Sequence, residues 1–492
     1  MKKQLLFGMA LVLSAIFAGQ ISAQAAVSVD PAVYTPRGLT NEMTLTSKWL
    51  YSNKLNNYNV AADLLGTAGS SRGMAAKNGK MYFSSRTTIN QILVINGTTG
   101  ARETPITLAS NVFTYLGRNK AGTADSTYLT GLPVNDIKID NAGNVLVANL
   151  ITSNAGRFQV YKINTTTGAG TLLIDQANLI TLFPTSSTMR FDAFGVWGDV
   201  NGKAVVLAAN ASTTAMEVYK WVITGGVAAA PTRIELDNSL ATGADLAGLA
   251  NLGTAPQVFP LDENLYYIDG NATFPVLCDK DGNVVDGFKA TLPNSIKDSV
   301  TAPAATPKTI WSMNQGHNGV VEFEVNGKYF IVMAATNTAG SPSSTFRLFK
   351  FADANKAFSG LTCLWTFPQA GMGNSLNSNT YRTAMPNVEV SGTKAKIYVY
   401  TGEVGYGMYE FDTATPNGVN QIRTSNVTIS LLDKSIVTSE EVAVMEVFNT
   451  AGQRFATVKN VSSISAPLSK GIYVISVIDR NGERKVQKMT IN

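Results

Sequence analysis

The feature that most constrains the fold of this chain is an internal repeat with a period of about 63 residues. Six segments share one pattern, in which an alternating apolar run is followed by a polar turn and a second apolar run. Their turn positions are 79, 143, 202, 264, 327 and 392, which are separated by 64, 59, 62, 63 and 65 residues. Regular repeats of this length are typical of propellers, solenoids and other arrays, so the repeat decides the architecture before any single motif does.

Each repeat contains two hairpin signals. Asn-Gly and Asp-x-x-Gly turns between apolar runs predict hairpins, because Asn and Gly tolerate the positive φ of a tight turn. A second hairpin follows in each unit, as in residues 92–100 and their close copy at 160–168. Four antiparallel strands repeated radially make a β-propeller, so we predict an all-β protein with a six-bladed β-propeller over residues 43–423. A solenoid is the alternative, but four antiparallel strands per repeat fit blades better.

A segment before the first repeat carries a signal for closing the array. Lys48-Trp49-Leu50-Tyr51-Ser52 resembles Leu364-Trp365-Thr366-Phe367-Pro368, which ends the fifth repeat. We therefore predict that the N-terminal strand supplies the outer edge of the last blade, which would leave no exposed sheet edge there.

Composition agrees with a large packed β-protein and excludes other classes. Of 492 residues, 45% are apolar and only 15% are charged, which argues against coiled coils and against disorder. The net charge of +5 is dispersed, with no run of Lys or Arg beyond the N-terminus. Nucleic acid is therefore not an expected partner.

The first residues predict export. Met1-Lys2-Lys3 precedes an apolar run over 5–17, and small residues then offer cleavage after Ala23 or Ala25. This order is typical of a secretory signal peptide over residues 1–25. The alternative is a membrane anchor, but the thirteen residues of the run are too few to span roughly 30 Å of hydrocarbon. We predict a mature protein without an integral membrane segment.

After about Arg423 the period stops, and residues 426–492 predict a compact C-terminal β-sandwich. Three stretches there, Asn449-Thr450-Ala451-Gly452-Gln453, Leu468-Ser469-Lys470-Gly471-Ile472-Tyr473 and Lys485-Val486-Gln487-Lys488, resemble a type IX secretion C-terminal sorting domain. The resemblance implies passage across the outer membrane of a Gram-negative bacterium, with the tail then removed or anchored at the cell surface. Asn426-Val427-Thr428 stands where family members have Pro-Asn-Pro, so a relic sandwich is the alternative. The repeat region is similar to uncharacterised secreted propeller families of Bacteroides-type bacteria.

Few residues suit a metal or a redox centre, and no cofactor is predicted. His317 is the only histidine, which excludes a zinc site built on several histidines. Cys278 and Cys363 form either a disulfide or two buried free thiols. Asp279-Lys280-Asp281-Gly282-Asn283 resembles a calcium loop, but its Gly and the missing Glu do not fit, and a hairpin turn is the better interpretation.

The repeat itself supplies the candidate site. In a propeller, the residues just before each innermost strand converge at one mouth of the central channel. These positions hold Arg72, Asp136, Asp192, Gln257, His317 with Asn318, and Arg382, separated by 64, 56, 65, 60 and 65 residues. Arg suits carboxylate groups, while Asp, Asn and Gln suit sugar hydroxyls. The alternative is that these charges only satisfy one another around a water-filled channel.

These features predict a secreted or cell-surface, monomeric and non-catalytic binding protein whose ligand is a glycan or a surface protein. The rival is a polysaccharide hydrolase or lyase acting at the same mouth. In that case Asp136 and Asp192 would be the acid/base pair, or His317 with Arg382 would eliminate a uronic acid. A third possibility is a structural surface protein whose channel binds nothing.

Overall fold

The computed structural model describes most of the chain between Arg37 and Ile491. The described ranges are 37–38, 43–52, 55, 72–84, 91–118, 125–153, 156–177, 179–183, 189–210, 216–237, 252–253, 255–270, 273–288, 319–335, 345–368, 371–373, 384–402, 404–414, 427–432, 435–465, 469–480 and 484–491. The chain divides into two compact units, Met1–Thr413 and Ala414–Asn492, here called the main unit and the C-terminal unit. The predicted signal peptide and the predicted domain boundary at 423–426 lie outside the described residues.

The main unit contains six antiparallel sheets of four or five strands among its described residues. Sheet 1 consists of β3 (Met74–Lys77), β4 (Lys80–Phe83), β5 (Gln91–Asn96) and β6 (Ile106–Thr107). Sheet 2 consists of β9 (Asp136–Ile139), β10 (Val145–Ala148), β11 (Arg157–Ile163) and β12 (Gly170–Ala177). Sheet 3 consists of β13 (Gly195–Gly198), β14 (Lys203–Ala209), β15 (Glu217–Thr224), β16 (Val227–Ala228) and β17 (Thr232–Glu235).

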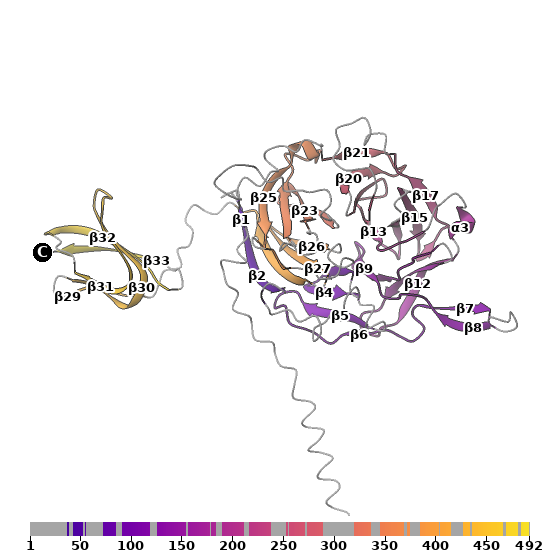
Figure 1. Cartoon of the computed structure of the whole chain (residues 1–492), viewed down its shortest axis with the longest axis horizontal. Helices are drawn as coiled ribbons and strands as arrows, with labels where there is room; N and C mark the ends of the chain where they lie inside the picture. The colour runs from indigo at the N-terminus through magenta and orange to yellow at the C-terminus, as the bar shows by residue number, and fades with distance from the viewer. Residues whose placement is uncertain are drawn as a thin grey trace, which may run out of the picture. The chain divides into compact units, whose positions relative to one another are not determined.

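The other three sheets follow in chain order. Sheet 4 consists of β18 (Gln257–Pro260), β19 (Leu265–Gly270), β20 (Thr273–Asp279) and β21 (Val284–Gly287). Sheet 5 consists of β22 (Val320–Val325), β23 (Lys328–Ala335), β24 (Thr345–Lys350), β25 (Thr362–Phe367) and β1 (Arg37–Gly38). Sheet 6 consists of β26 (Ala384–Ser391), β27 (Lys394–Thr401), β28 (Gly405–Asp412) and β2 (Thr44–Ser52). Figure 1 shows the sheets following one another around the main unit, with β9, β13 and β26 toward its middle.

The six hairpins predicted from the turn positions are confirmed. They are the pairs β3–β4, β9–β10, β13–β14, β18–β19, β22–β23 and β26–β27. The turn residues take the backbone conformation that favours Asn and Gly: φ is 54° at Asn78 and 70° at Gly79, and 53° at Asn326 and 66° at Gly327. In these two hairpins, local turn chemistry therefore places the turn where the sequence predicts it.

Both faces of each sheet are buried against a neighbouring sheet. In β27, Ile397 and Val399 enter the apolar cluster shared with sheet 5, while Tyr398 and Tyr400 enter the cluster shared with sheet 1. Alternate residues of a strand point to opposite faces, so a strand buried on both sides needs an almost continuous apolar run. Six such clusters join the sheets in order, and the last joins sheet 6 to sheet 1.

The N-terminal strand closes sheet 6, as the sequence predicted. β2 pairs antiparallel with β28 and becomes the outer strand of that sheet. Trp49 on β2 then packs in the cluster between sheets 6 and 1, and its Nε1 donates a hydrogen bond of 3.2 Å to the carbonyl oxygen of Gly97. β2 thus covers the edge of β28 that would otherwise be exposed, and its Trp49 side chain attaches sheet 6 to sheet 1.

One glycine permits a close approach between neighbouring first strands. A Cβ atom at Gly195 of β13 would lie 2.2 Å from the carbonyl oxygen of Val258 in β18. Any side chain at position 195 would therefore push sheet 3 away from sheet 4.

The remaining described elements of the main unit are short. β7 (Thr114–Arg118) and β8 (Asp125–Leu129) form a separate hairpin between sheets 1 and 2, and α3 (Leu179–Leu182) and the 3₁₀ turn η2 (Phe358–Gly360) are single turns. The main unit is therefore all-β in its described part, and no helix there is long and apolar enough to cross a membrane.

The C-terminal unit has five strands around its own apolar core. They are β29 (Ile429–Leu432), β30 (Ser435–Asn449), β31 (Arg454–Ser465), β32 (Gly471–Ile478) and β33 (Arg484–Ile491). The long strand β30 pairs with β29, β31 and β32, and β33 pairs with β32. Met445, Val447, Ile475 and Val477 are fully buried in this core.

Cys278 and Cys363 are not joined in a disulfide, and both are buried. Cys278 lies in the cluster between sheets 3 and 4, whereas Cys363 lies in the cluster between sheets 4 and 5. Burial raises the pKa of the Cys278 thiol to about 12. A thiol held so far from ionisation is a poor nucleophile, so Cys278 serves as a small apolar core residue.

Candidate functional site

Four of the seven predicted mouth residues fall in the described part of the chain. Arg72, Asp136, Asp192 and Gln257 are all buried, with 5%, 1%, 3% and 2% of their surface exposed. Asp136 and Gln257 are the first residues of β9 and β18, and Arg72 and Asp192 precede β3 and β13 by a few residues. The other three, His317, Asn318 and Arg382, lie outside the described residues.

Asp192 is the centre of an ion network that joins the segments preceding sheets 1 and 3. Its Oδ1 accepts a hydrogen bond of 2.6 Å from a terminal nitrogen of Arg72, which comes from sheet 1. Arg190, two residues before Asp192, donates two hydrogen bonds to the same carboxylate. Its Nε lies 2.6 Å from Oδ2, and a terminal nitrogen lies 2.7 Å from Oδ1. Two guanidinium groups therefore neutralise one buried carboxylate. Arg190 was not predicted from the sequence, although it stands only two residues before Asp192.

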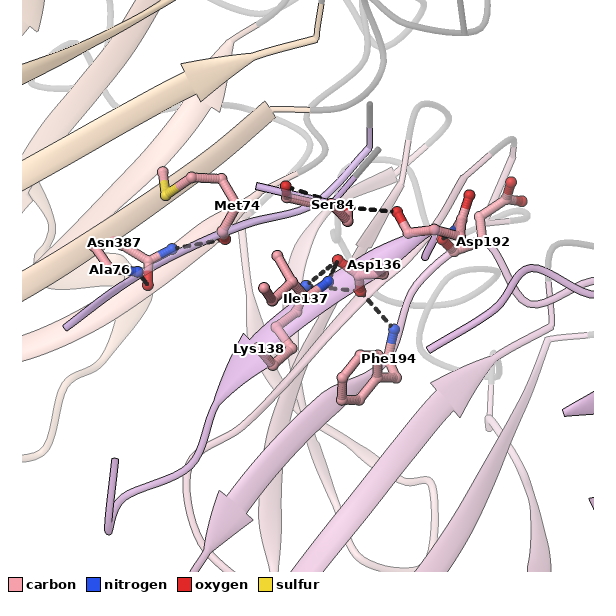
Figure 2. A network of polar contacts seen from close by, with 11 residues as sticks. Met74, Ala76, Ser84, Asp136, Ile137, Lys138, Asp192, Phe194 and Asn387 are labelled. Carbon is pink, nitrogen blue, oxygen red and sulfur yellow. Dashed lines mark hydrogen bonds and ion pairs between the residues drawn. The ribbon is translucent and has the colours of Figure 1, made fainter. Parts of the chain in front are cut away.

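Asp136 is held by backbone and side-chain donors on both of its oxygens. Oδ1 accepts from the backbone N–H of Ile137 at 2.9 Å, and Oδ2 accepts from the backbone N–H of Phe194 at 3.0 Å (Figure 2). The ammonium group of Lys138 lies 2.7 Å from both oxygens. Burial raises the pKa of Asp136, while Lys138 and the two backbone donors act against that rise. Lys138 was not predicted from the sequence.

Backbone carbonyl groups extend the same network between sheets. The hydroxyl of Ser84, at the end of β4, donates to the carbonyl oxygen of Asn135 at 2.8 Å. The side-chain amide of Asn135 donates in turn to the carbonyl oxygen of Asp192 at 2.7 Å. The inner ends of sheets 1, 2 and 3 are thus tied together by polar groups, and Figure 2 shows Ser84, Asp136 and Asp192 side by side. We call these contacts the polar network.

Sheet 4 differs from sheets 1 to 3, because two of its buried side-chain oxygens accept no hydrogen bond from the described residues. Gln257 lies directly opposite Asp269 of β19 in the sheet. Asp269 Oδ2 accepts a hydrogen bond of 2.8 Å from the backbone N–H of Gly319, but Asp269 Oδ1 and Gln257 Oε1 are buried and have no hydrogen-bond partner among the described residues. Burial raises the pKa of Asp269 well above its usual range, and only the Gly319 N–H opposes that rise. Asp269 was not predicted from the sequence, because it lies inside an apolar run without a motif around it.

A cavity of about 190 Å³ opens between the first strands of all six sheets. Each strand contributes apolar lining, which includes Met74, Ile139, Val196, Val258, Val321 and Met385. Its polar side chains are Lys138 on β9, Glu322 on β22 and Asn387 on β26. We call this space the central cavity; it adjoins the polar network through Lys138, which lines the cavity and binds Asp136.

The polar side chains of the central cavity already have protein partners. Glu322 accepts a hydrogen bond of 2.6 Å from the hydroxyl of Tyr267 and one from the ammonium group of Lys356. Asn387 joins sheet 6 to sheet 1, since its Oδ1 accepts from the N–H of Ala76 and its Nδ2 donates to the carbonyl of Met74, both at 3.3 Å (Figure 2). Each charge at the cavity wall is therefore balanced by an opposite charge nearby.

The hydrogen bonds of Asp136 and Asp192 limit the acid/base chemistry that these two carboxylates can perform. An acid/base pair must reach the bond that breaks, whereas every oxygen of Asp136 and Asp192 already accepts a hydrogen bond from the protein. Within the described residues, no three His, Cys, Asp or Glu side chains are grouped as metal ligands would be. Asp279–Asn283 forms the expected hairpin turn, with Asp279 Oδ1 accepting from the N–H groups of Asp281 and Asn283.

The fold and the site define an all-β protein of antiparallel sheets arranged around a central cavity. The chain belongs to the family described as Domain of unknown function (DUF8500), which matches residues 82–337, just over half of the 492 residues. That description assigns no activity. No curated protein matches the chain.

Among solved structures, the chain is similar to a DUF4623 family protein from Bacteroides eggerthii DSM 20697. The two share 14% identity with a TM-score of 0.52, over 77% of this chain and 76% of the other. At that identity the similarity concerns the fold alone. The computationally designed Ika8 protein matches 87% of this chain and 98% of its own at 10% identity, with a TM-score of 0.27.

Proposed function

We propose that the main unit is a six-bladed β-propeller that binds a glycan at its central cavity without catalysis. The observation that carries the proposal is the central cavity itself, which combines apolar walls from all six first strands with Lys138, Glu322 and Asn387. Binding sites for small ligands are typically concave and mostly apolar, with a few polar groups that fix orientation. Those are the properties of this cavity.

Three features support the propeller part of the proposal. Each sheet has at least four antiparallel strands in the order expected for a blade. The six apolar clusters link consecutive sheets and include one between the last and the first. β2 precedes sheet 1 in the sequence but pairs with β28 of sheet 6. The N-terminal part of the chain therefore supplies the outer strand of the last sheet, as in a closed propeller.

The polar network favours binding over the rival hydrolase or lyase. Asp136 binds Lys138 and accepts two backbone N–H groups, and Asp192 binds Arg72 and Arg190. Neither carboxylate is therefore placed to exchange a proton with a substrate. Removing either carboxylate would disrupt contacts between sheets. We therefore assign these two residues to the support of the cavity wall rather than to chemistry.

A glycan array probed with the chain from Ala26 to Asn492 tests this function. We expect binding to a restricted set of glycans, which calorimetry should reproduce with the glycan recovered intact. New reducing ends or unsaturated uronic acid products would instead establish the hydrolase or lyase. Silence across the array would reject the glycan and turn the search to a protein partner.

We also propose that the C-terminal unit acts as an export and sorting domain. Two of the stretches that resemble such domains have defined structural roles. Asn449 Oδ1 accepts from the N–H groups of Ala451 and Gln453 and so holds the turn between β30 and β31. The Tyr473 ring is buried in the core, and its hydroxyl donates to the carbonyl of Ser469 at 3.0 Å. These contacts support a stably folded C-terminal unit that can serve as a sorting signal.

Truncation tests the sorting proposal. A chain ending at Thr413, expressed in a bacterium with a type IX system, should accumulate in the periplasm, whereas the full chain should reach the surface or the medium. As a control, Tyr473→Ala should also lower export, because it removes a core side chain of the C-terminal unit. Equal export of the full and truncated chains would contradict the proposal.

A further inference from the structure

We infer that the C-terminal unit docks on an anionic lipid bilayer through one face of its sheet. The surface concerned is the side of strands β30, β32 and β33 that points away from the core of this unit, here called the outer face. This role goes beyond the proposed glycan binding and depends on neither that binding nor export.

The strand register defines the outer face. Met445 of β30 and Ile475 of β32 are buried in the core of the C-terminal unit, and alternate residues of a strand point to opposite sides of a sheet. The residues next to them in sequence therefore point to the outer face. Its apolar members come from three neighbouring strands and are Val444, Phe448, Ile472, Val474, Ile478 and Val486.

The outer face is more apolar than a water-facing sheet needs to be. An antiparallel sheet that packs one face on a core normally alternates apolar and polar residues, but residues 442–448 and 472–478 are almost continuously apolar. Ile472 and Val486 are 39% and 50% exposed, and Phe448 and Val474 are half-buried. Apolar side chains gathered on one exposed surface are typical of a docking site.

Two lysines flank this apolar surface from opposite sides. Lys459 of β31 lies opposite Val444, and Lys488 of β33 lies opposite Val474, so both belong to the outer face. Both side chains are exposed, and neither forms an ion pair with another described residue. Since β30 and β32 lie between their strands, the two lysines are separated by three strand spacings of about 4.8 Å each.

The charge of the outer face identifies the occupant. Glu446 is the one acidic residue among the described side chains of this face, and its Oε1 lies 3.1 Å from a terminal nitrogen of Arg454. The positive charge of Lys459 and Lys488 is thus left over, and it disfavours pairing with the same face of a second copy. An anionic bilayer is complementary, because lysines meet its headgroups while apolar side chains enter the boundary below them.

Vesicle binding by the chain from Ala26 to Asn492 tests the inference. The vesicles contain phosphatidylcholine alone or an equimolar mixture of phosphatidylcholine and phosphatidylglycerol. We expect the affinity for the anionic vesicles to be at least about tenfold higher, and to fall as salt is added, because salt screens exposed charges. Absence of binding, or equal affinity for the two kinds of vesicle, would overturn the inference.

Lys488→Gln and Lys485→Gln form a matched pair on one strand. Lys488 belongs to the outer face, whereas Lys485 lies opposite the core residue Val477 and so belongs to the other side of the sheet. Each change removes one positive charge from β33. We expect Lys488→Gln to lower the affinity for anionic vesicles about fivefold and Lys485→Gln to leave it unchanged. Equal losses would show that net charge alone drives binding and would overturn the assignment of the face.

Removing apolar surface gives a second and independent readout. Ile472→Thr combined with Val486→Thr keeps β-branched side chains, which suit strands, and should lower the affinity for anionic vesicles by at least about tenfold. The control is Leu431→Thr with Leu432→Thr, at positions that are 39% and 61% exposed on β29, which pairs with the other half of β30. The control should bind as the unaltered chain does. Should the first pair fail to fold, as judged by circular dichroism, Val486→Thr alone gives the readout.

Other occupants of the outer face give different results. A dimer in light scattering that Ile472→Thr with Val486→Thr dissociates would assign the face to a second copy and overturn the inference. Vesicle binding that survives both this pair and Lys488→Gln would place the lipid contact elsewhere and overturn it as well. Glycan arrays and export assays are separate measurements, so failure of either proposed function is distinguishable from failure of lipid docking.

Discussion

Replacement of Asp192 by alanine is expected to lower the free energy of unfolding of the main unit by about 3–5 kcal/mol. The substitution removes the carboxylate that Arg72 contacts at 2.6 Å, and the Arg72 side chain is only 5% exposed. It also leaves the guanidinium groups of Arg72 and Arg190 near each other without the anion that they share. Denaturant titration followed by tryptophan fluorescence measures the change.

Asp175→Ala is the matched control for this prediction. Asp175 also binds an arginine through both of its oxygens, but the side chains of Arg157 and Asp175 are 27% and 30% exposed. Water can solvate both groups after the change, so we expect a loss of about 1 kcal/mol or less. Equal losses for the two variants would show that the polar network adds nothing specific to the contact between sheets.

The second prediction concerns pH. Burial raises the pKa of Asp269 in the folded chain above the value of about 3.9 found in unfolded chains. The folded state therefore binds this proton more tightly, and the resulting stabilisation is complete below about pH 4 and is lost as the pH rises through the folded pKa. Asp269→Asn carries a neutral amide at every pH. We expect the variant to gain stability relative to the unaltered chain as the pH rises from 4, by up to about 1.4 kcal/mol per pH unit.

The physical reason lies in the hydrogen bonds. An amide at position 269 can still accept from Gly319 N–H and can donate toward Gln257 Oε1, which has no partner in the structure. Tyr267, two residues before Asp269 on β19, keeps its hydrogen bond to Glu322 in the variant, so this contact is the same in both chains. Free energies of unfolding measured between pH 4 and pH 8 give this difference directly.

Asp140→Asn provides the opposite case in the same chain. Asp140 Oδ1 accepts from the N–H of Asn144, and Oδ2 accepts from the Asn144 side chain and from the N–H of Val200. An amide nitrogen in place of either oxygen would lose an acceptor, so we expect destabilisation by about 1–3 kcal/mol. If Asp269→Asn proves as destabilising as Asp140→Asn, with a difference that does not change with pH, the raised pKa of Asp269 is ruled out.

The sequence predicted the hairpins well because their signals are local. Asn78-Gly79 and Asn326-Gly327 determine turns through the φ values that these residues tolerate, and that preference acts within a few residues. The closing strand was also predictable, because Trp49 stands in an apolar motif like one found elsewhere in the repeat. The candidate site was less predictable. Arg72, Asp136 and Asp192 were found from their spacing, but their partners Arg190 and Lys138 were not.

The sequence by itself determined the repeat, the all-β class and the positions of the strands, because turn chemistry and apolar runs act over short distances along the chain. Only the tertiary structure decided which polar groups meet. Arg72 and Asp192 are 120 residues apart and form an ion pair. Gln257 and Asp269 lie opposite each other in sheet 4, and Gln257 Oε1 and Asp269 Oδ1 accept no hydrogen bond from the described residues. Whether a buried charge is neutralised depends on groups that the fold brings within about 4 Å, and no local pattern in the chain records that distance.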